Sequence, residues 1–303
     1  MTGKKNKEYN FNRISPQSNI ILNILFILYT VVCIAPIILV IIISFTDEKT
    51  IFKNGYSFFP EKWSTAAYTY LLKGGGMILH AYGVSIFVAV VGTIASILII
   101  AMYAYPLSRS NFKYKNTFSF LAYFTMIFGG GLVPWVIVYS QVVKISNTIW
   151  ILIVPYLMNA WYVIILRTFM KQTIPESVIE SAKVDGAGEF RTFFVIVLPL
   201  CKAGLATIGL FCLLGYWNDW YLPLIFITNK EFYNIQFLMY QTLSNIQFLS
   251  NTTIGNASEI AASLPSEAAR MAVAVISIGP IIFAYPFFQK NFIKGLTIGA
   301  VKG

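Results

Sequence analysis

Long stretches without any charged side chain constrain the fold of this 303-residue chain more than any other feature. Six strongly apolar stretches of at least 16 residues contain no Lys, Arg, Asp or Glu: 20–45, 82–107, 116–143, 145–166, 203–218 and 271–289. A helix needs about 20 such residues to cross the roughly 30 Å hydrocarbon core of a bilayer. The fifth stretch is short, but its apolar run resumes at 220–228, just after Asp219.

These stretches predict an all-α polytopic membrane protein with six transmembrane helices. The alternative is a set of buried helices in a large soluble core. Such helices need polar outer faces beside them, and the composition, with only 11% charged residues, does not supply them.

The distribution of basic residues predicts the orientation of the chain. If the N-terminus is cytoplasmic, the inner segments carry 15 of the 22 Lys and Arg, and the outer segments carry seven. Because cytoplasmic loops are enriched in Lys and Arg, we expect both termini inside and a multi-pass location in the cell membrane. The net charge of +10 then reflects orientation and not nucleic-acid binding, since the bases are spread over four short segments.

The sequence gives little support to catalysis or metal binding. The three cysteines and the single His80 do not have metal-ligand spacing, and the predicted spans contain no carboxylate pair. A Gly-x4-Gly-Lys-Ser/Thr phosphate loop is also absent from the sequence. We therefore expect no catalytic residue, no metal and no ATPase site in this chain, and we do not expect an enzyme.

Two features within the predicted spans are candidates for a translocation path. The first is a helix break at Gly130, Gly131 and Pro134, which a membrane tolerates only beside other helices or a water-filled cavity. Close helix packing through small residues explains the glycines equally well. The second is Asp219, whose burial in a span costs upward of about 2.5 kcal/mol, so we expect it to face a cavity or a partner.

The residues that precede Asp219 are included in the same candidate path: Tyr216, Trp217 and Asn218. Their aromatic members also fit a belt at the outer membrane interface, which would place Asp219 at that interface instead of in a cavity.

One short segment, 167–202, concentrates charge of both signs. Four acids lie there with five bases, although segments that only orient a membrane protein need no acids. We therefore expect a protein partner at this segment. Thr173 is the predicted N-cap of a first helix, which Gly186 should end because glycine adopts the left-handed C-cap conformation.

A second helix should start near Glu189 and stop before Pro199, because the residue before a proline avoids the helical region. Its apolar stripe is predicted to consist of Phe190, Phe193, Phe194 and Val197. A simple cytoplasmic hairpin is the alternative to a docking turn.

The same segment resembles the EAA motif of the permease subunits of ABC importers, EAA-x3-G-x9-I-x-LP. The matching positions are Glu180-Ser181-Ala182, Gly186, Ile196 and Leu198-Pro199, with Ser181 in place of the middle alanine. Trp217-Asn218-Asp219 and the tail 289–303 are similar to carbohydrate-uptake permeases of the maltose-permease G type. Shorter and less specific motifs around 265–281 resemble those of permeases for polysaccharides or complex oligosaccharides.

The resemblance implies the type I ABC importer permease fold, with residues 1–80 before the core, 81–290 as the core, a coupling loop at 171–200 and a cytoplasmic tail at 291–303. It also implies which residues couple to the ATPase: Glu180, Ser181, Ala182, Asp185, Gly186, Ala187, Leu198 and Pro199. The implied partners are a homologous second permease forming a heterodimer, two ATP-binding subunits that hold ATP and Mg, and an extracytoplasmic solute-binding protein.

The function expected on this basis is uptake of carbohydrates, most simply oligosaccharides, through a path of which this chain forms half. Two alternatives remain open at the level of sequence. The first is a permease of the same family for a non-sugar solute. The second is an ATP-independent channel or carrier, which would need more intramembrane ionisable groups and no docking turn.

Overall fold

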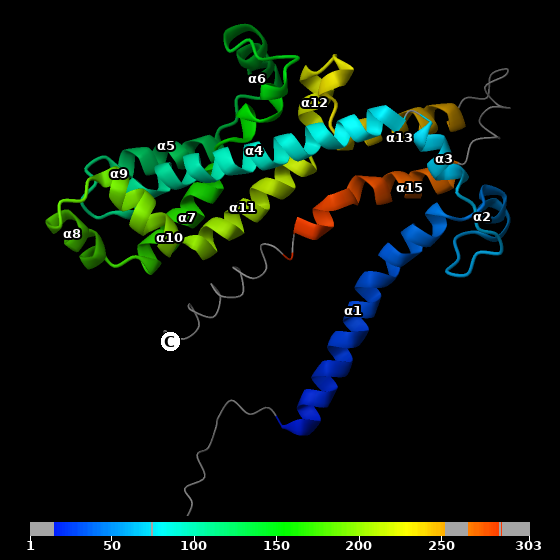
Figure 1. Cartoon of the computed structure of the whole chain (residues 1–303), viewed down its shortest axis with the longest axis horizontal. Helices are drawn as coiled ribbons and strands as arrows, with labels where there is room; N and C mark the ends of the chain where they lie inside the picture. The colour runs from blue at the N-terminus through cyan, green and yellow to red at the C-terminus, as the bar shows by residue number, and fades with distance from the viewer. Residues whose placement is uncertain (1–14, 74, 252–265, 285, 287–303) are drawn as a thin grey trace, which may run out of the picture. The chain divides into compact units, whose positions relative to one another are not determined.

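The computed structural model describes residues 15–73, 75–251, 266–284 and 286 (Figure 1). The described elements are helices, and one isolated β-bridge joins Thr46 to Trp63. The chain divides into two compact units: residues 1–70 with 263–275, and residues 71–262 with 276–303. The N-terminal segment and the C-terminal tail 289–303 lie outside the described residues.

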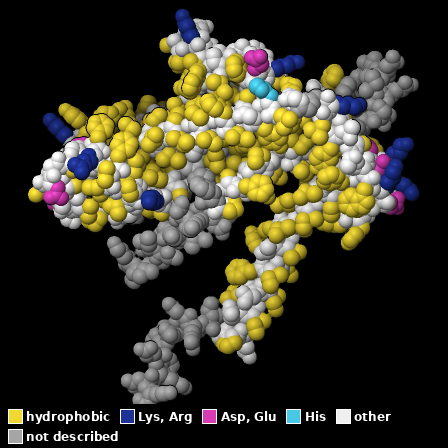
Figure 2. Space-filling model, in the orientation of Figure 1, with side chains coloured by type: hydrophobic (Ala, Val, Ile, Leu, Met, Phe, Trp, Pro, Cys, Tyr) yellow, Lys and Arg dark blue, Asp and Glu magenta, His cyan; other side chains and the backbone are white. Residues whose placement is uncertain are grey.

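The first unit contains the long helix α1 (Pro16–Ser44), the short helix α2 (Glu48–Asn54) and the beginning of α15 (Ser266–Ile278). The side chains of α1 are exposed along most of its length, as expected of a helix that contacts lipid (Figure 2). The Glu48 carboxylate accepts hydrogen bonds from the amides of Glu267 and Ala268, at 2.8 and 3.0 Å. It thereby caps the N-terminus of α15 with a negative charge.

The second unit is built around α4 (Gly75–Ser108), with α11 (Lys202–Trp217) and α7 (Ala160–Thr173) as its main neighbours (Figure 1). Helix α5 (Lys115–Ile127) also packs on α4 and α7. The approach of α4 and α11 requires a glycine, because a Cβ at Gly92 would lie only 2.6 Å from the Tyr216 ring.

Three helical stretches are long and apolar enough to cross a membrane: Pro16–Ser44, Gly76–Ser108 and Ser266–Phe283. Three bent pairs raise the number to six: Lys115–Ile127 with Leu132–Val142, Ile149–Tyr156 with Ala160–Thr173, and Glu189–Leu200 with Lys202–Trp217. The six predicted stretches therefore each find helical counterparts, and the described residues form a multi-pass membrane protein.

The third predicted span, 116–143, is not one straight helix. Helix α5 ends at Ile127, and after the glycines α6 (Leu132–Ile137) and the π-helix η1 (Val138–Val142) run at 114° to it. Gly131 has φ = +82°, a conformation that residues with a Cβ rarely adopt, so the change of direction depends on glycine. The fourth span bends by 51° between the short helices η2 (Ile149–Leu152) and η3 (Val154–Tyr156) and helix α7.

The sixth span also breaks, where α15 passes into the 3₁₀ helix η6 (Gly279–Phe283). Pro280 has no amide hydrogen, so the Ile276 carbonyl four residues earlier loses its helical donor. The Tyr82 hydroxyl donates to that carbonyl instead, at 2.5 Å. The next carbonyl, that of Ser277, accepts from Trp217 Nε1 at 3.1 Å and from Gln236 Nε2 at 3.0 Å.

Gln236 belongs to α13 (Ile235–Asn251), so side chains from α4, α11 and α13 donate hydrogen bonds to the two carbonyls just before this break. This is the compensation that backbone breaks require in a membrane.

Candidate functional site

The charged segment folds into a pair of helical arms, which we call the coupling hairpin (residues 176–200). Its first arm is α8 (Glu176–Val184). Its second arm is a continuous helical run of α9 (Glu189–Arg191), the π-helix η4 (Thr192–Val197) and α10 (Leu198–Leu200). In Figure 1 the hairpin lies beside the C-terminal end of α4.

The first arm begins later than the sequence predicted. Thr173 is not an N-cap, because it is the last residue of α7. Ile174 precedes Pro175 and is extended (φ −111°, ψ 104°), as the residue before a proline tends to be. Pro175 itself takes the N-cap position of α8, and Glu176 lies in the first turn, where its charge complements the helix dipole.

The end of the first arm is as predicted. Gly186 has φ = +77° and follows the C-cap residue Asp185. The amide of Ala187 donates to the Ala182 carbonyl at 2.9 Å, and the amide of Gly186 donates to the Lys183 carbonyl at 3.0 Å. These two bonds form a Schellman motif, which satisfies the last carbonyls of α8 and fixes the direction of the turn.

The second arm departs from the prediction in two ways. It continues through Pro199 to Leu200, with the wider π-helical turn of η4 just before the proline. We attribute this to the changed hydrogen-bond spacing of the π turn, which relieves the usual clash of a proline ring with the carbonyl four residues earlier. Only Phe193 and Val197 of the predicted stripe are buried; the side chains of Phe190 and Phe194 are exposed.

A shared apolar core anchors both arms. Ile179 of the first arm and Phe193 and Val197 of the second arm are buried in one cluster with residues of α4, α7 and α11. Ala182 is also buried, with 7% of its surface exposed, so it faces this chain rather than the surface offered to a partner.

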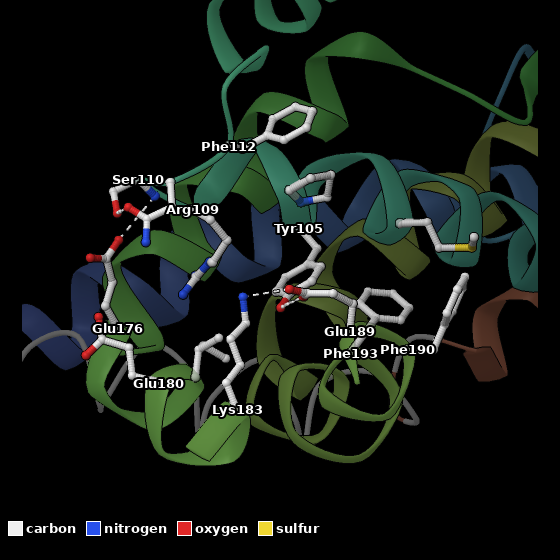
Figure 3. A pocket seen from close by; sticks show the side chains of 14 residues that line it. Tyr105, Arg109, Ser110, Phe112, Glu176, Glu180, Lys183, Glu189, Phe190 and Phe193 are labelled. Atoms are coloured by element: carbon white, nitrogen blue, oxygen red, sulfur yellow. Dashed lines mark hydrogen bonds and ion pairs between the residues drawn. The ribbon is translucent and has the colours of Figure 1, made fainter. Parts of the chain in front are cut away.

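Three polar contacts supplement this core (Figure 3). The Ser110 amide donates to Glu176 at 3.1 Å, and hydrogen bonding to Ser110 lowers the pKa of the Glu176 carboxyl. Lys183 forms an ion pair with Glu189 at 2.6 Å across the turn, and the Tyr105 hydroxyl donates to the same carboxylate at 3.1 Å. The hairpin is thus tied to the end of α4 and to the loop that follows it.

Most of the remaining predicted coupling residues are exposed on the hairpin, either near its turn or, for Pro199, at the far end of the second arm. Glu180, Ser181, Asp185, Gly186 and Pro199 are exposed, whereas Ala187 and Leu198 are partly buried. Sequence reasoning missed Val184, whose side chain is 88% exposed between Lys183 and Asp185. An apolar residue immediately before a helix-ending Asp-Gly pair is the signal that could have identified it.

A pocket of about 540 Å³ lies between the hairpin and the α4–α5 loop, and sequence reasoning also missed it. Arg109 and Lys183 extend into this pocket from opposite sides (Figure 3). Arg109 donates to the Met170 carbonyl at 3.4 Å, but its Nη1 atom is buried without a hydrogen-bond partner among the described residues.

A second cavity, of about 560 Å³, surrounds the end of α11. Its lining comes from the fourth and fifth predicted spans and the residues after them: Pro155, Tyr156, Met158, Asn159, Tyr162, Phe211, Cys212, Gly215, Tyr216, Asn218, Asp219, Trp220 and Tyr221. We call this the Asp219 cavity. Its volume falls within the 300–1,000 Å³ typical of small-molecule sites.

Asp219 is 8% exposed, and one of its two carboxylate oxygens accepts hydrogen bonds from backbone amides. Oδ1 accepts from the amides of Tyr221 and Leu222, at 3.1 and 3.2 Å, and from the Tyr156 hydroxyl at 3.3 Å. It therefore holds the start of α12 (Tyr221–Phe226). The other oxygen, Oδ2, is buried and has no hydrogen-bond partner among the described residues.

The other predicted path residues divide into two groups. Asn218 and Tyr216 line the Asp219 cavity, the first exposed and the second buried with its hydroxyl bonded to Ser96 and to the Ile153 carbonyl. Trp217 is buried against the break of the sixth span and is not part of the lining.

Gly130, Gly131 and Pro134 are exposed in the connection from α5 to α6, and they do not line the cavity either. Helix α6 instead packs on α12, where Trp135 contacts Tyr221 and Phe226 with ring centroids 6.2 and 5.0 Å apart.

Residues 96–298 match the model of the family described as "Binding-protein-dependent transport system inner membrane component". The chain is 35% identical to the polygalacturonan/rhamnogalacturonan transport system permease protein YtcP of Bacillus subtilis (strain 168), over 91% of this chain and 95% of that protein. It is also 35% identical to Protein LplC of the same organism, over 90% of each.

Among solved structures, a chain of a bacterial ABC transporter involved in the import of the acidic polysaccharide alginate superposes with a TM-score of 0.76. The superposition covers 92% of this chain and 99% of that chain at 24% identity, which supports the fold.

Proposed function

Because the chain belongs to the family of binding-protein-dependent transport system inner membrane components, we propose that it is one of two permease subunits of an ATP-driven oligosaccharide importer. The observation that carries the proposal is the coupling hairpin. Its tip is exposed, and both of its arms are anchored in a core that includes α7 and α11, two helices that also line the Asp219 cavity. Movement imposed on the turn is transmitted to those helices, since a packed core resists independent movement of its parts.

The partners follow from this role. Two ATP-binding subunits supply ATP hydrolysis and hold ATP and Mg, and an extracytoplasmic solute-binding protein delivers the sugar. A homologous second permease completes the path. Binding and hydrolysis of ATP shift the permease pair between inward-open and outward-open states, and the hairpin links the two equilibria.

The orientation is part of the proposal. The exposed tip carries charges of both signs and belongs on the cytoplasmic side, with the N-terminus inside. A cysteine at Asp185 should react with a membrane-impermeant maleimide in inverted vesicles and not in intact cells. Labelling in intact cells alone would contradict this orientation.

Reconstitution tests the function directly. Proteoliposomes with both permeases, the ATPase and the binding protein should accumulate a labelled oligosaccharide only when ATP is present on the side of the ATPase. Proteoliposomes with this chain alone should accumulate none. Uptake without ATP by this chain alone would identify a channel or carrier instead, and ATP-dependent uptake of a non-sugar solute in place of sugars would correct the substrate class.

A further inference from the structure

The side chains that line the Asp219 cavity indicate which charge the transported sugar should have. Among the described residues that line it, Asp219 contributes the one carboxylate, and the others have aromatic, aliphatic, amide, thioether or thiol side chains or are glycine. Lysine, arginine and histidine are not among the described residues that line it. The names of the relatives do not fix this property, since those of YtcP and of the alginate transporter refer to acidic polysaccharides.

The aromatic part of the wall suits sugar rings. Tyr162 and Phe211 lie nearly parallel, with centroids 6.0 Å apart, and Trp220 and Tyr221 are 40% and 39% exposed. Aromatic faces offer large apolar surfaces against which the apolar face of a sugar ring can pack. The exposed amide of Asn218 offers a donor and an acceptor to hydroxyl groups.

Unlike the aromatic side chains, the Asp219 carboxylate discriminates between neutral and negatively charged sugars. Its Oδ1 is held by three donors, so the side chain is fixed at the wall. Its Oδ2 has no partner among the residues that the structure describes and is buried, and electrostatic interactions at such a position are stronger than in water. A carboxylate on a sugar in this cavity would be repelled unless the two groups shared a proton. A neutral sugar meets no such repulsion.

We infer that this subunit admits neutral, hydroxyl-rich oligosaccharides and disfavours uronate-containing ones, with Asp219 as the residue that sets this preference. The inference rests on the proposed function and narrows its substrate class. It applies to the half of the path that this chain forms and is independent of which sugars the solute-binding protein binds.

The test measures ligand binding to the cavity without the binding protein. The complex of both permeases with the ATPase, in nanodiscs, is incubated with a neutral galactotriose or with trigalacturonate, and saturation-transfer NMR reports contact with each. At pH 7.5 the neutral sugar should bind at least about tenfold more tightly. Asp219→Asn keeps an acceptor for the start of α12, and it should reduce the ratio toward one.

Asn218→Asp serves as the matched variant, since it adds a carboxylate to the same wall and should widen the ratio. Equal or tighter binding of trigalacturonate by the wild type would overturn the inference, as would a ratio that Asp219→Asn leaves unchanged in a complex with normal ATPase activity. Neither result would affect ATP-dependent sugar uptake. Failure of both sugars to bind and to be transported would instead contradict the proposed function.

Discussion

The two ends of α4 are held to their neighbours by different kinds of interaction. At the C-terminal end, Ile179, Phe193 and Val197 bury apolar side chains against α4, α7 and α11, and the ion pair between Lys183 and Glu189 is exposed. At the N-terminal end, partly or fully buried hydrogen bonds join the elements. They include those from Tyr82 to the Ile276 carbonyl and from Asn234 to the Asp219 carbonyl, at 2.5 Å each.

This difference follows from where the backbone is broken. The coupling hairpin closes its own turn through local bonds, so apolar packing is the main interaction that joins it to the rest of the chain, supplemented by hydrogen bonds from Ser110 and Tyr105. The opposite end contains the break at Pro280 and the junction after α11, and each leaves carbonyls or amides that other elements must satisfy. Substitutions that remove apolar side-chain volume should therefore be most destabilising at the C-terminal end of α4. Substitutions that remove hydrogen-bond donors should be most destabilising at its N-terminal end.

The largest effect is expected from removing volume under the hairpin. Ile179→Ala deletes three carbons from a side chain that is 6% exposed and should destabilise the chain by about 2–5 kcal/mol. The neighbouring Val178→Ala is the control, because Val178 is 36% exposed and should cost less than about 1 kcal/mol. Denaturant or SDS unfolding of the purified complex measures both, and equal losses would contradict the packing account.

The turn should be sensitive at one of its two glycines. Gly186→Val forces a β-branched residue into φ = +77° and should cost about 1–3 kcal/mol while lowering ATPase activity stimulated by the sugar-loaded binding protein. Gly188 in the same turn has φ = −69°, and a Cβ there meets nothing within 4 Å. Gly188→Ala should therefore be close to wild type in both assays. Similar defects in the two variants would show that backbone conformation is not the cause.

At the N-terminal end of α4, the stability cost of losing a hydrogen-bond donor should depend on whether another donor to the same carbonyl remains. Tyr82→Phe leaves the Ile276 carbonyl without its side-chain donor and should cost about 1–3 kcal/mol. Trp217→Phe should cost less in hydrogen bonding, because Gln236 still donates to the Ser277 carbonyl. The double variant with Trp217→Phe and Gln236→Leu should lose more free energy of unfolding than the sum of the losses in the two single variants. Strict additivity in this double-mutant cycle would argue against a shared acceptor.

The smallest effect is expected from the ion pair across the turn. Lys183 and Glu189 have side chains that are 53% and 62% exposed, so Lys183→Met should cost less than about 1 kcal/mol and lose even that at high salt. A cost comparable with that of Ile179→Ala would show that charge, and not volume, holds the hairpin.

The sequence could predict features that depend on local chemistry. Charge-free stretches located the spans, and an Asp-Gly pair after a charged helix located the turn at Gly186, because glycine serves this conformation at little cost. The fixed spacing of Glu180, Gly186 and Pro199 indicated the family, which the comparisons confirmed.

Other features depend on tertiary packing and were missed or wrongly predicted. The stripe from Phe190 to Val197 was assigned with α-helical periodicity, but the π-helical turn of η4 rotates the later residues and leaves Phe190 and Phe194 outside. The 114° bend after α5 could be located at its glycines, but its size is set by the packing of α6 on α12.

The central claim is that the exposed turn of the hairpin is where the ATPase engages this chain. A photoreactive cross-linker at Ser181→Cys tests it most directly in the assembled complex, with the native cysteines replaced by serine and Tyr221→Cys at the opposite end as the control. Our account predicts an adduct with the ATPase subunit from position 181 and none from position 221. An ATPase adduct from position 221, with none from position 181, would contradict it.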